Sequence, residues 1–114
     1  MNRTYSLKRH KEFHFTYRVG KKVSCKPFTL VYARNRLDKM QVGFSVSKKI
    51  GNSVERNRCK RRLRACFSCF LPRVKKGYNL IFVARSESLE EQFELLKNDM
   101  KTLLERAGLL EDRI

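Results

Sequence analysis

The 114-residue sequence has no long hydrophobic segment and few acidic residues. No apolar run approaches the roughly 20 residues that a membrane-spanning helix needs, and residues 1–6 lack the apolar stretch of a signal peptide. Only 11 Asp and Glu oppose 27 Lys and Arg, so the formal net charge is +16. With 41% hydrophobic residues, the composition excludes a disordered basic tail and predicts a single domain over residues 1–114. We therefore expect a cytoplasmic protein without a membrane partner.

The shortage of acidic residues is confined to the first half of the chain. Residues 1–62 contain 18 basic residues and only three acids, whereas residues 63–114 contain nine and eight. A concentrated positive field on a folded domain costs self-repulsion, which a polyanion relieves. Nucleic acid is therefore the expected partner. An anionic membrane surface is the weaker alternative, because the best amphipathic segment, residues 89–107, is rich in Glu rather than Lys.

The four cysteines do not have the spacing of a metal site or of a disulfide framework. Cys59 and Cys66 are seven residues apart on the apolar side of a predicted helix, and buried thiols are common in protein cores. A zinc site needs a second pair of ligands, and only the distant His10 and His14 are available. Disulfides are disfavoured in a reducing cytosol. The sequence thus predicts that the protein alone binds no metal.

The hydrophobic pattern of the first half predicts one helix followed by strands. Ser6 is expected to cap a helix over residues 7–19, with Gly20 ending it in the left-handed conformation. Residues 25–34 are typical of a strand, with a short partner strand just before them. In residues 41–47, large apolar residues alternate with small or polar ones, as in a strand. One face of that strand has Val42, Phe44 and Val46, and the other has Gln41, Gly43, Ser45 and Ser47.

A helix from residue 53 to about residue 70 is predicted next. Asn52 and Glu55 have the spacing of a capping box at its start, and Pro72 follows its end. A helical wheel places the apolar residues together. They are Cys59, Leu63, Cys66, Phe67 and Phe70. This helix is therefore expected to be core on one side and cationic on the other.

The remaining residues predict a central strand and a final helix. The segment 78–85 contains a continuous apolar run, residues 80–84, as in a strand at the centre of a sheet. Ser88 and Glu91 have the spacing of a second capping box, which would open a helix that ends at Gly108. The predicted order is α-β-β-β-α-β-α, an α+β arrangement.

The segment 48–64 is the densest functional signal, with eight cations among 17 residues. The guanidinium group of arginine can donate two parallel hydrogen bonds to phosphate oxygens. Backbone amides at the start of a helix also attract an anion. The alternative is a charged helix face that only meets solvent. Like charges one turn apart, such as Lys60 and Arg64, destabilise an isolated helix and favour a compensating anion. The candidate RNA-binding residues are Lys48, Lys49, Asn52, Arg56, Asn57, Arg58, Lys60, Arg61 and Arg64.

Residues 45–61, with Arg56-Asn57-Arg58 at their centre, resemble the signature of the bacterial ribonuclease P protein component. The similarity covers most of the chain. It includes a Leu- and Lys-rich opening, Phe13, Gly20, the strand around residues 28–32, Val42-Gly43, and Ala84-Arg85. Tyr17 differs slightly, since Phe is common at that position of the family.

The resemblance implies a small α/β two-layer sandwich with a mixed sheet. It also implies a left-handed crossover through the basic helix, which the pattern cannot predict because nearly all such connections are right-handed. The implied activity is endonucleolytic removal of the 5′ leader from precursor tRNA by a ribonucleoprotein. Its RNA subunit is catalytic and requires Mg²⁺. The basic helix would lie against that RNA, and a cleft between the first helix and the sheet would receive the leader.

Two aromatic residues fit the implied leader cleft. Phe13 and Tyr17 are one helical turn apart and could stack on single-stranded bases. The small residues of the strand opposite, Ser45 and Ser47 with Gly43, would leave room for a nucleotide backbone. Phe13 and Tyr17 could also pack on the core, and core packing is the expected role of Phe15.

Other functions are less consistent with the residues. His10 and His14 have helical spacing and could transfer protons, but on a basic helix they are more consistent with phosphate contacts. The scattered acids of the first half disfavour a two-metal nuclease, so no catalytic residue is predicted. A structural or ribosomal RNA-binding protein would explain the charge but not the extended motif. The sequence has no evident helix-turn-helix spacing, which disfavours DNA binding.

Overall fold

The computed structural model describes residues 6–7 and 10–111 of the chain. They form four strands, four α-helices and two 3₁₀ helices among the described residues. In order these are α1 (His10–Val19), β1 (Lys21–Ser24), β2 (Phe28–Arg34), β3 (Gln41–Ser45), η2 (Lys48–Ile50), α2 (Ser53–Ser68), η3 (Leu71–Arg73), β4 (Tyr78–Ala84), α3 (Glu87–Glu90) and α4 (Phe93–Arg106). The observed order contains the predicted elements together with the two 3₁₀ helices and the short α3.

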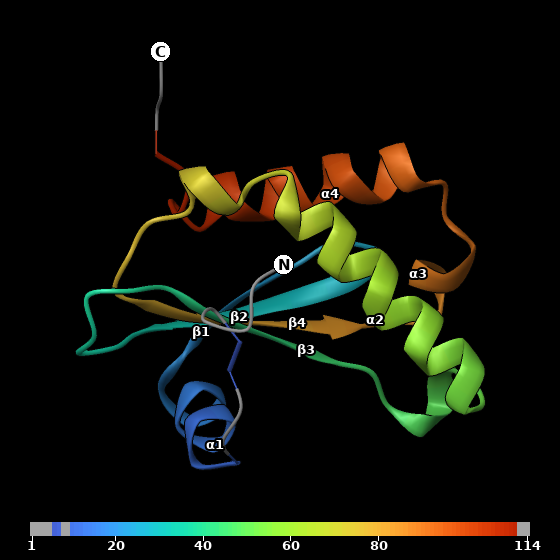
Figure 1. The fold of residues 1–114 in the computed structure, drawn as a ribbon, viewed down its shortest axis with the longest axis horizontal. Helices are drawn as coiled ribbons and strands as arrows, with labels where there is room; N and C mark the ends of the chain where they lie inside the picture. Colours follow the sequence, from blue (N-terminus) through green and yellow to red (C-terminus); the bar gives the residue numbers. More distant parts are fainter. Residues whose placement is uncertain (1–5, 8–9, 112–114) are drawn as a thin grey trace.

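The four strands form one mixed sheet in the order β1-β2-β4-β3. β2 runs antiparallel to β1 and to β4, whereas β3 runs parallel to β4. The predicted central position of the apolar strand is thus confirmed. In Figure 1, α2 and α4 lie on one face of the sheet and α1 lies on the other. The α+β class is confirmed, and the handedness of the connection through α2 stays a prediction.

The main core lies between the sheet and the α2–α4 layer. Alternate residues of each strand face it, and Phe82 of β4 is at its centre. The Phe82 ring lies 5.7 Å from the ring of Phe28 and 5.7 Å from that of Phe67 on α2, and it stacks on Phe44 at 5.9 Å. The five apolar residues predicted for this helix are all buried, although α2 ends at Ser68 and Phe70 lies after it. This packing fixes which side of α2 remains available to a partner.

A smaller cluster lies on the opposite face, under α1. Leu7, Val31 and Ile81 are buried there, with Phe13 and Val83 packed against them. Part of the sequence-based account of this region is wrong. Ser6 pairs with Val42 in an isolated parallel bridge, so it extends the sheet instead of capping a helix. Leu7 precedes the helix, and the predicted helical positions 8 and 9 lie outside the described residues.

Gly20 ends α1 for a different reason from the predicted one. Its φ is not positive, in contrast to Gly51, Gly77 and Gly108. The Gly20 amide donates to the Thr16 carbonyl at 2.8 Å, and a Cβ atom at this position would lie 2.9 Å from Val31 Cγ1. The same Cβ would lie still closer to the Thr16 carbonyl oxygen, so glycine is required by the close approach of the chain to the last turn of α1 and to β2.

The second predicted capping box is also wrong. Ser88 is buried, and its hydroxyl donates to the Arg85 carbonyl at 2.7 Å and lies 3.1 Å from Cys59 Sγ. The chain forms the short α3, becomes extended at Glu91, and only then begins α4. Ser88, which the local pattern predicts to cap a helix, thus contacts α2 instead. The predicted left-handed end at Gly108 is confirmed, with φ of 72°.

Candidate nucleic-acid interface

The start of α2 is held by a capping box between Asn52 and Glu55. Asn52 Oδ1 accepts a hydrogen bond from the Glu55 amide at 2.9 Å, and Glu55 Oε1 accepts one from the Asn52 amide at 3.0 Å. Glu55 is the single acid of α2, so this contact uses the one anionic group of the helix. Asn52, a predicted RNA-binding residue, therefore also has a structural role.

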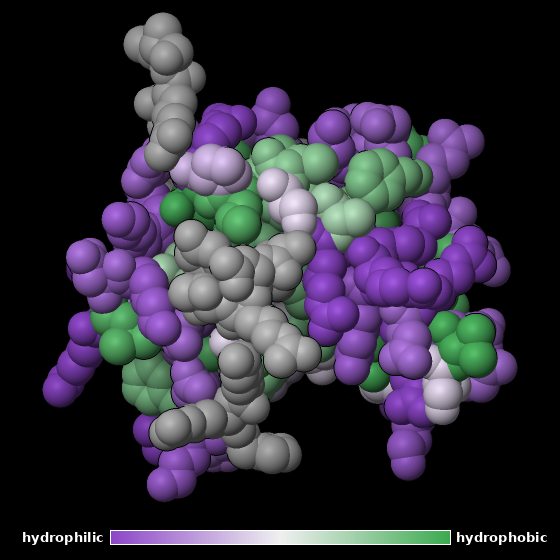
Figure 2. Space-filling view, viewed as in Figure 1, coloured by the Kyte–Doolittle hydropathy of each residue, from purple (hydrophilic) through white to green (hydrophobic). Residues whose placement is uncertain are grey.

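The outward side of α2 and the adjoining η2 form a cationic surface. Figure 2 shows hydrophilic residues gathered over α2. Of the nine predicted RNA-binding residues, Asn52 and six others are exposed, and the remaining two, Arg56 and Lys60, are half-buried. The six exposed residues besides Asn52 are Lys48, Lys49, Asn57, Arg58, Arg61 and Arg64. The structure thus brings the predicted set together along one helix and the turn before it.

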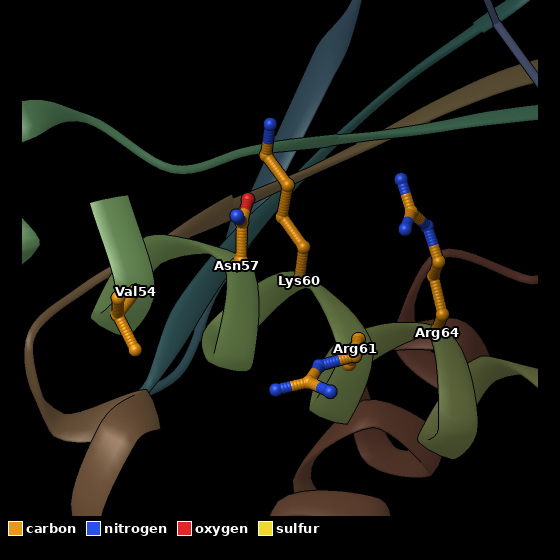
Figure 3. Close-up of a pocket in the computed structure, with 5 residues that line it drawn as sticks. All are labelled: Val54, Asn57, Lys60, Arg61 and Arg64. Atoms are coloured by element: carbon orange, nitrogen blue, oxygen red, sulfur yellow. The ribbon is translucent and has the colours of Figure 1, made fainter.

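A shallow hollow of about 530 Å³ lies on this surface. In Figure 3, Asn57, Lys60 and Arg64 extend from the same side of α2, and Arg61 leaves on a neighbouring side. The spacing explains the arrangement, because residues three and four apart are neighbours on a helix. Val54, whose side chain is 73% exposed, completes the hollow. Several cations around a shallow depression suit a phosphate backbone rather than an enclosed small molecule.

Two arginines of α2 are partly used within the fold. Arg62, which is not in the predicted set, donates from Nη2 to the carbonyl of Glu91 and joins α2 to the start of α4. Arg56 donates from Nη2 to Ser53 Oγ at 3.4 Å, while its buried Nε has no hydrogen-bond partner among the described residues. Arg61 is therefore exposed to solvent, whereas the adjacent Arg62 is hydrogen-bonded within the fold.

The second predicted site lies on the other face of the sheet. Phe13 packs over Gly43, where an added Cβ would lie 2.5 Å from Phe13 Cζ. Tyr17, one turn later, has 38% of its surface exposed. Ser45 is half-buried on the same sheet face as Gly43, whereas Ser47 is exposed beyond the end of β3. The structure thus brings Phe13 and Ser45 to one face and leaves Ser47 beside η2.

Sequence reasoning missed other residues of this face. The strand register aligns Ser24, Thr29 and Val83 with Ser45 in one row across the sheet. None of the four is buried. Thr29 Oγ1 lies 2.9 Å from Ser24 Oγ and accepts a hydrogen bond from Arg85 Nη2 at 3.1 Å. Only the pairing of distant strands reveals this row, so no local signal could have found it.

The expected core role of Phe15 is wrong. Its side chain is 39% exposed, because Thr16 occupies the position that faces the sheet. Thr16 is fully buried, donates from Oγ1 to the Glu12 carbonyl at 2.7 Å, and accepts from Asn79 Nδ2 at 3.2 Å. Local helical spacing could not show that a polar residue would face the sheet here.

The cysteines are consistent with structural roles. Cys59 and Cys66 are buried, and loss of solvation on burial raises the pKa of both thiols, that of Cys66 to about 11. Burial also raises the pKa of the half-buried Cys25 to about 11, while Cys69 is exposed at the end of α2. Within the described residues no group of three or more His, Cys, Asp and Glu could hold a metal ion. That the protein alone binds no metal stays a prediction.

Two further expectations concern the histidines and the membrane. His14 is exposed on α1, and His10 begins that helix. The side chain of His10 lies outside the described part of the structure, so the histidine pair is not placed. No helix in residues 6–7 and 10–111 is both long and apolar enough to span a bilayer.

Comparison with known proteins identifies the class to which this fold and cationic helix belong. The family model for ribonuclease P matches residues 1–108. The ribonuclease P protein component of Caldanaerobacter subterraneus subsp. tengcongensis is 39% identical over 107 residues, covering 94% of this chain and 92% of the relative. That of a Thermoanaerobacter species is 41% identical over 103 residues, covering 90% and 89%.

A solved structure supports the same assignment. The RNase P protein of Staphylococcus aureus superposes with a TM-score of 0.84 at 28% identity, covering 94% of this chain and 98% of that one. The chain belongs to the family of ribonuclease P protein components, the protein subunits of the ribonuclease P enzyme.

Proposed function

We propose that residues 1–114 form a single RNA-binding domain that holds the catalytic RNA of ribonuclease P through η2 and α2. The observation that carries the proposal is the exposed cationic side of α2, whose single acid is used in the capping box. Phosphates would bind Arg58, Arg61 and Arg64 by charge-assisted hydrogen bonds. Family membership lends no support to the alternative of a structural or ribosomal RNA-binding protein.

The 5′ leader of precursor tRNA would bind the opposite face of the sheet. Tyr17 and the exposed part of Phe13 offer aromatic surfaces for stacking, and the row containing Ser45 and Thr29 has small side chains beside them. The Arg85 guanidinium at Thr29 adds a cation at this row. One domain would thus contact the catalytic RNA and the substrate through different faces.

The chemistry would come from the RNA subunit, with Mg²⁺ held by RNA phosphates instead of by this chain. The described residues offer no cluster of carboxylates or histidines that fits a bound divalent ion. The protein would act in the cytoplasm, where it would lower the electrostatic cost of bringing two polyanions together.

Reconstitution tests this function directly. Precursor tRNA is incubated with protein alone, RNA alone, and both, in Mg²⁺. We expect no cleavage by RNA-free protein and efficient leader removal by the combination at low Mg²⁺. Cleavage by the protein alone that is lost in a variant with His10→Ala and His14→Ala would overturn the proposal and indicate a protein-based active site.

A further inference from the structure

A second hollow, of about 570 Å³, lies on the side of α1 away from the proposed leader site. Lys11, Glu12 and Phe15 line it from α1, and the end of β2 and the turn before β3 line it from the sheet. Phe13 and Phe15 are about 200° apart around a helix, so they point to different flanks of α1. Gln41 lies on the same sheet face as Gly43 and Ser45, so this hollow and the proposed leader site share that face and lie on opposite flanks of α1.

The floor of the hollow contains an amide without a partner. Gln41 lines the hollow and is only 9% exposed, yet its side chain has no hydrogen bond to any residue that the structure describes. The neighbouring Asn79 amide differs: it donates to Thr16 Oγ1 at 3.2 Å and accepts from Asn35 Nδ2 at 2.9 Å. Oε1 and Nε2 of Gln41 are not among the buried polar atoms that lack a partner, so this amide is accessible from the hollow and is the group open to a ligand.

The walls combine apolar surface with positive charge. Phe15 is 39% exposed and Leu37, in the turn after β2, is 46% exposed. Lys11, Arg34 and Arg36 provide three cations around the hollow against one lining carboxylate, Glu12. A ligand for this hollow should have a flat apolar face, a polar edge and a negative charge.

We propose that this hollow binds one unpaired nucleotide of RNA. Its base would lie against Phe15 and Leu37, its hydrogen-bonding edge would meet the Gln41 amide, and its phosphate would contact the surrounding cations. Unpaired bases of RNA are bound in this way, by stacking on aromatic side chains and by hydrogen bonds to their edges. The inference rests on RNA being the partner, as proposed above, and adds a third contact region.

Two small-molecule probes distinguish binding of the base from binding of the phosphate. Adenosine 5′-monophosphate is titrated into the full chain, and amide chemical shifts are recorded by NMR, with ribose 5-phosphate as the probe without a base. We expect both probes to shift amides near the cations, and the nucleotide to shift amides of residues 11–15 and 35–41 clearly more than ribose 5-phosphate does. Equal shifts with both probes, or none with either, would overturn the proposal, because no base would then be bound.

Matched variants test the two contacts to the base. Phe15→Ala should weaken nucleotide affinity about fivefold or more, in the range expected for stacking. Phe93→Ala removes a similarly exposed ring, 37% against 39%, from α4 and should change nothing. Gln41→Leu should weaken affinity about threefold or more, in the range expected for a lost hydrogen bond. If Gln41→Leu fails to fold, the exposed Phe15 still decides the test.

Crosslinking in the reconstituted ribonucleoprotein identifies the source of the nucleotide. A photoreactive benzoylphenylalanine at position 37 should attach to one unpaired nucleotide of the catalytic RNA or of the precursor tRNA. Attachment to protein instead would overturn the nucleotide proposal and favour a peptide ligand. If RNA binds and is cleaved normally but no RNA crosslink forms, this inference fails while the proposed function stands.

Discussion

Arg61 and Arg62 are adjacent on α2 but have different environments. Arg61 is exposed beside the cationic hollow, whereas Arg62 Nη2 donates to the Glu91 carbonyl at the start of α4. A helix turns about 100° per residue, so neighbouring positions face different surroundings. The pair therefore separates the proposed RNA contact, at Arg61, from a contact that stabilises the fold, at Arg62.

Arg61→Ala is expected to weaken binding of the catalytic RNA without unfolding the protein. The loss should depend on salt, and the log-log slope of affinity against salt should fall by about one, because one phosphate contact is removed. Affinity is measured at several salt concentrations, with Lys101→Ala on α4 as an exposed cationic control. An unchanged affinity and slope in Arg61→Ala and Arg58→Ala would show that RNA binds elsewhere.

Arg62→Ala is expected to act mainly on stability. Loss of its hydrogen bond leaves the Glu91 carbonyl without this charged donor, so the free energy of unfolding should fall by about 1–3 kcal/mol. Urea denaturation of Arg62→Ala and Arg61→Ala measures the contrast. Equal stability of the two variants would contradict the role assigned to Arg62.

Asn52→Ala is expected to destabilise the start of α2. Loss of the cap should lower the free energy of unfolding by about 0.5–2 kcal/mol. Asn52→Asp keeps an acceptor for the Glu55 amide and should largely retain stability, but its negative charge should weaken RNA binding if Asn52 lies at the interface. Comparing urea midpoints and RNA affinity of both variants separates the two roles. RNA affinity unchanged in Asn52→Asp would remove Asn52 from the interface.

Tyr17→Ala is expected to reduce the affinity for precursor tRNA with a long leader by about 1–3 kcal/mol, through loss of stacking. Mature tRNA, which has no leader, should be almost unaffected. Tyr17 is a cleaner test than Phe13, because Phe13 also packs against the small core cluster. The ratio of the two affinities is measured in the reconstituted particle. A wild-type ratio would place the leader elsewhere.

Stability is expected to fall as pH rises from 9 towards 11, in part through Cys66. Burial holds this thiol protonated in the folded protein up to a pKa of about 11, against 9.0 for an ordinary thiol. The unfolded chain therefore loses its proton first, and the stabilisation present below pH 9 is lost as pH rises. The slope is at most about 1.4 kcal/mol per pH unit. Cys66→Ala should show a shallower decline in urea denaturation between pH 8.5 and 10.5, and an identical slope would contradict this assignment.

Several features of the protein follow from the sequence alone because they depend on residues close together in the chain. The reciprocal bonds of Asn52 and Glu55 need a spacing of three residues, and the apolar side of α2 needs only helical periodicity. Continuous apolar character likewise indicated that β4 lies inside the sheet. The basic motif on α2 also identified the family.

Other features were decided by contacts between distant segments. Ser88 bonds to Arg85 and lies against Cys59 instead of capping a helix, and Ser6 joins the sheet beside Val42. Thr16 turns Phe15 outward because Asn79, 63 residues later, supplies a hydrogen bond beneath α1. The hollow with Gln41 at its floor depends on the same pairing of β3 with β4. Local propensity cannot predict such contacts, since a polar side chain has many possible partners until the strand register brings one of them within reach.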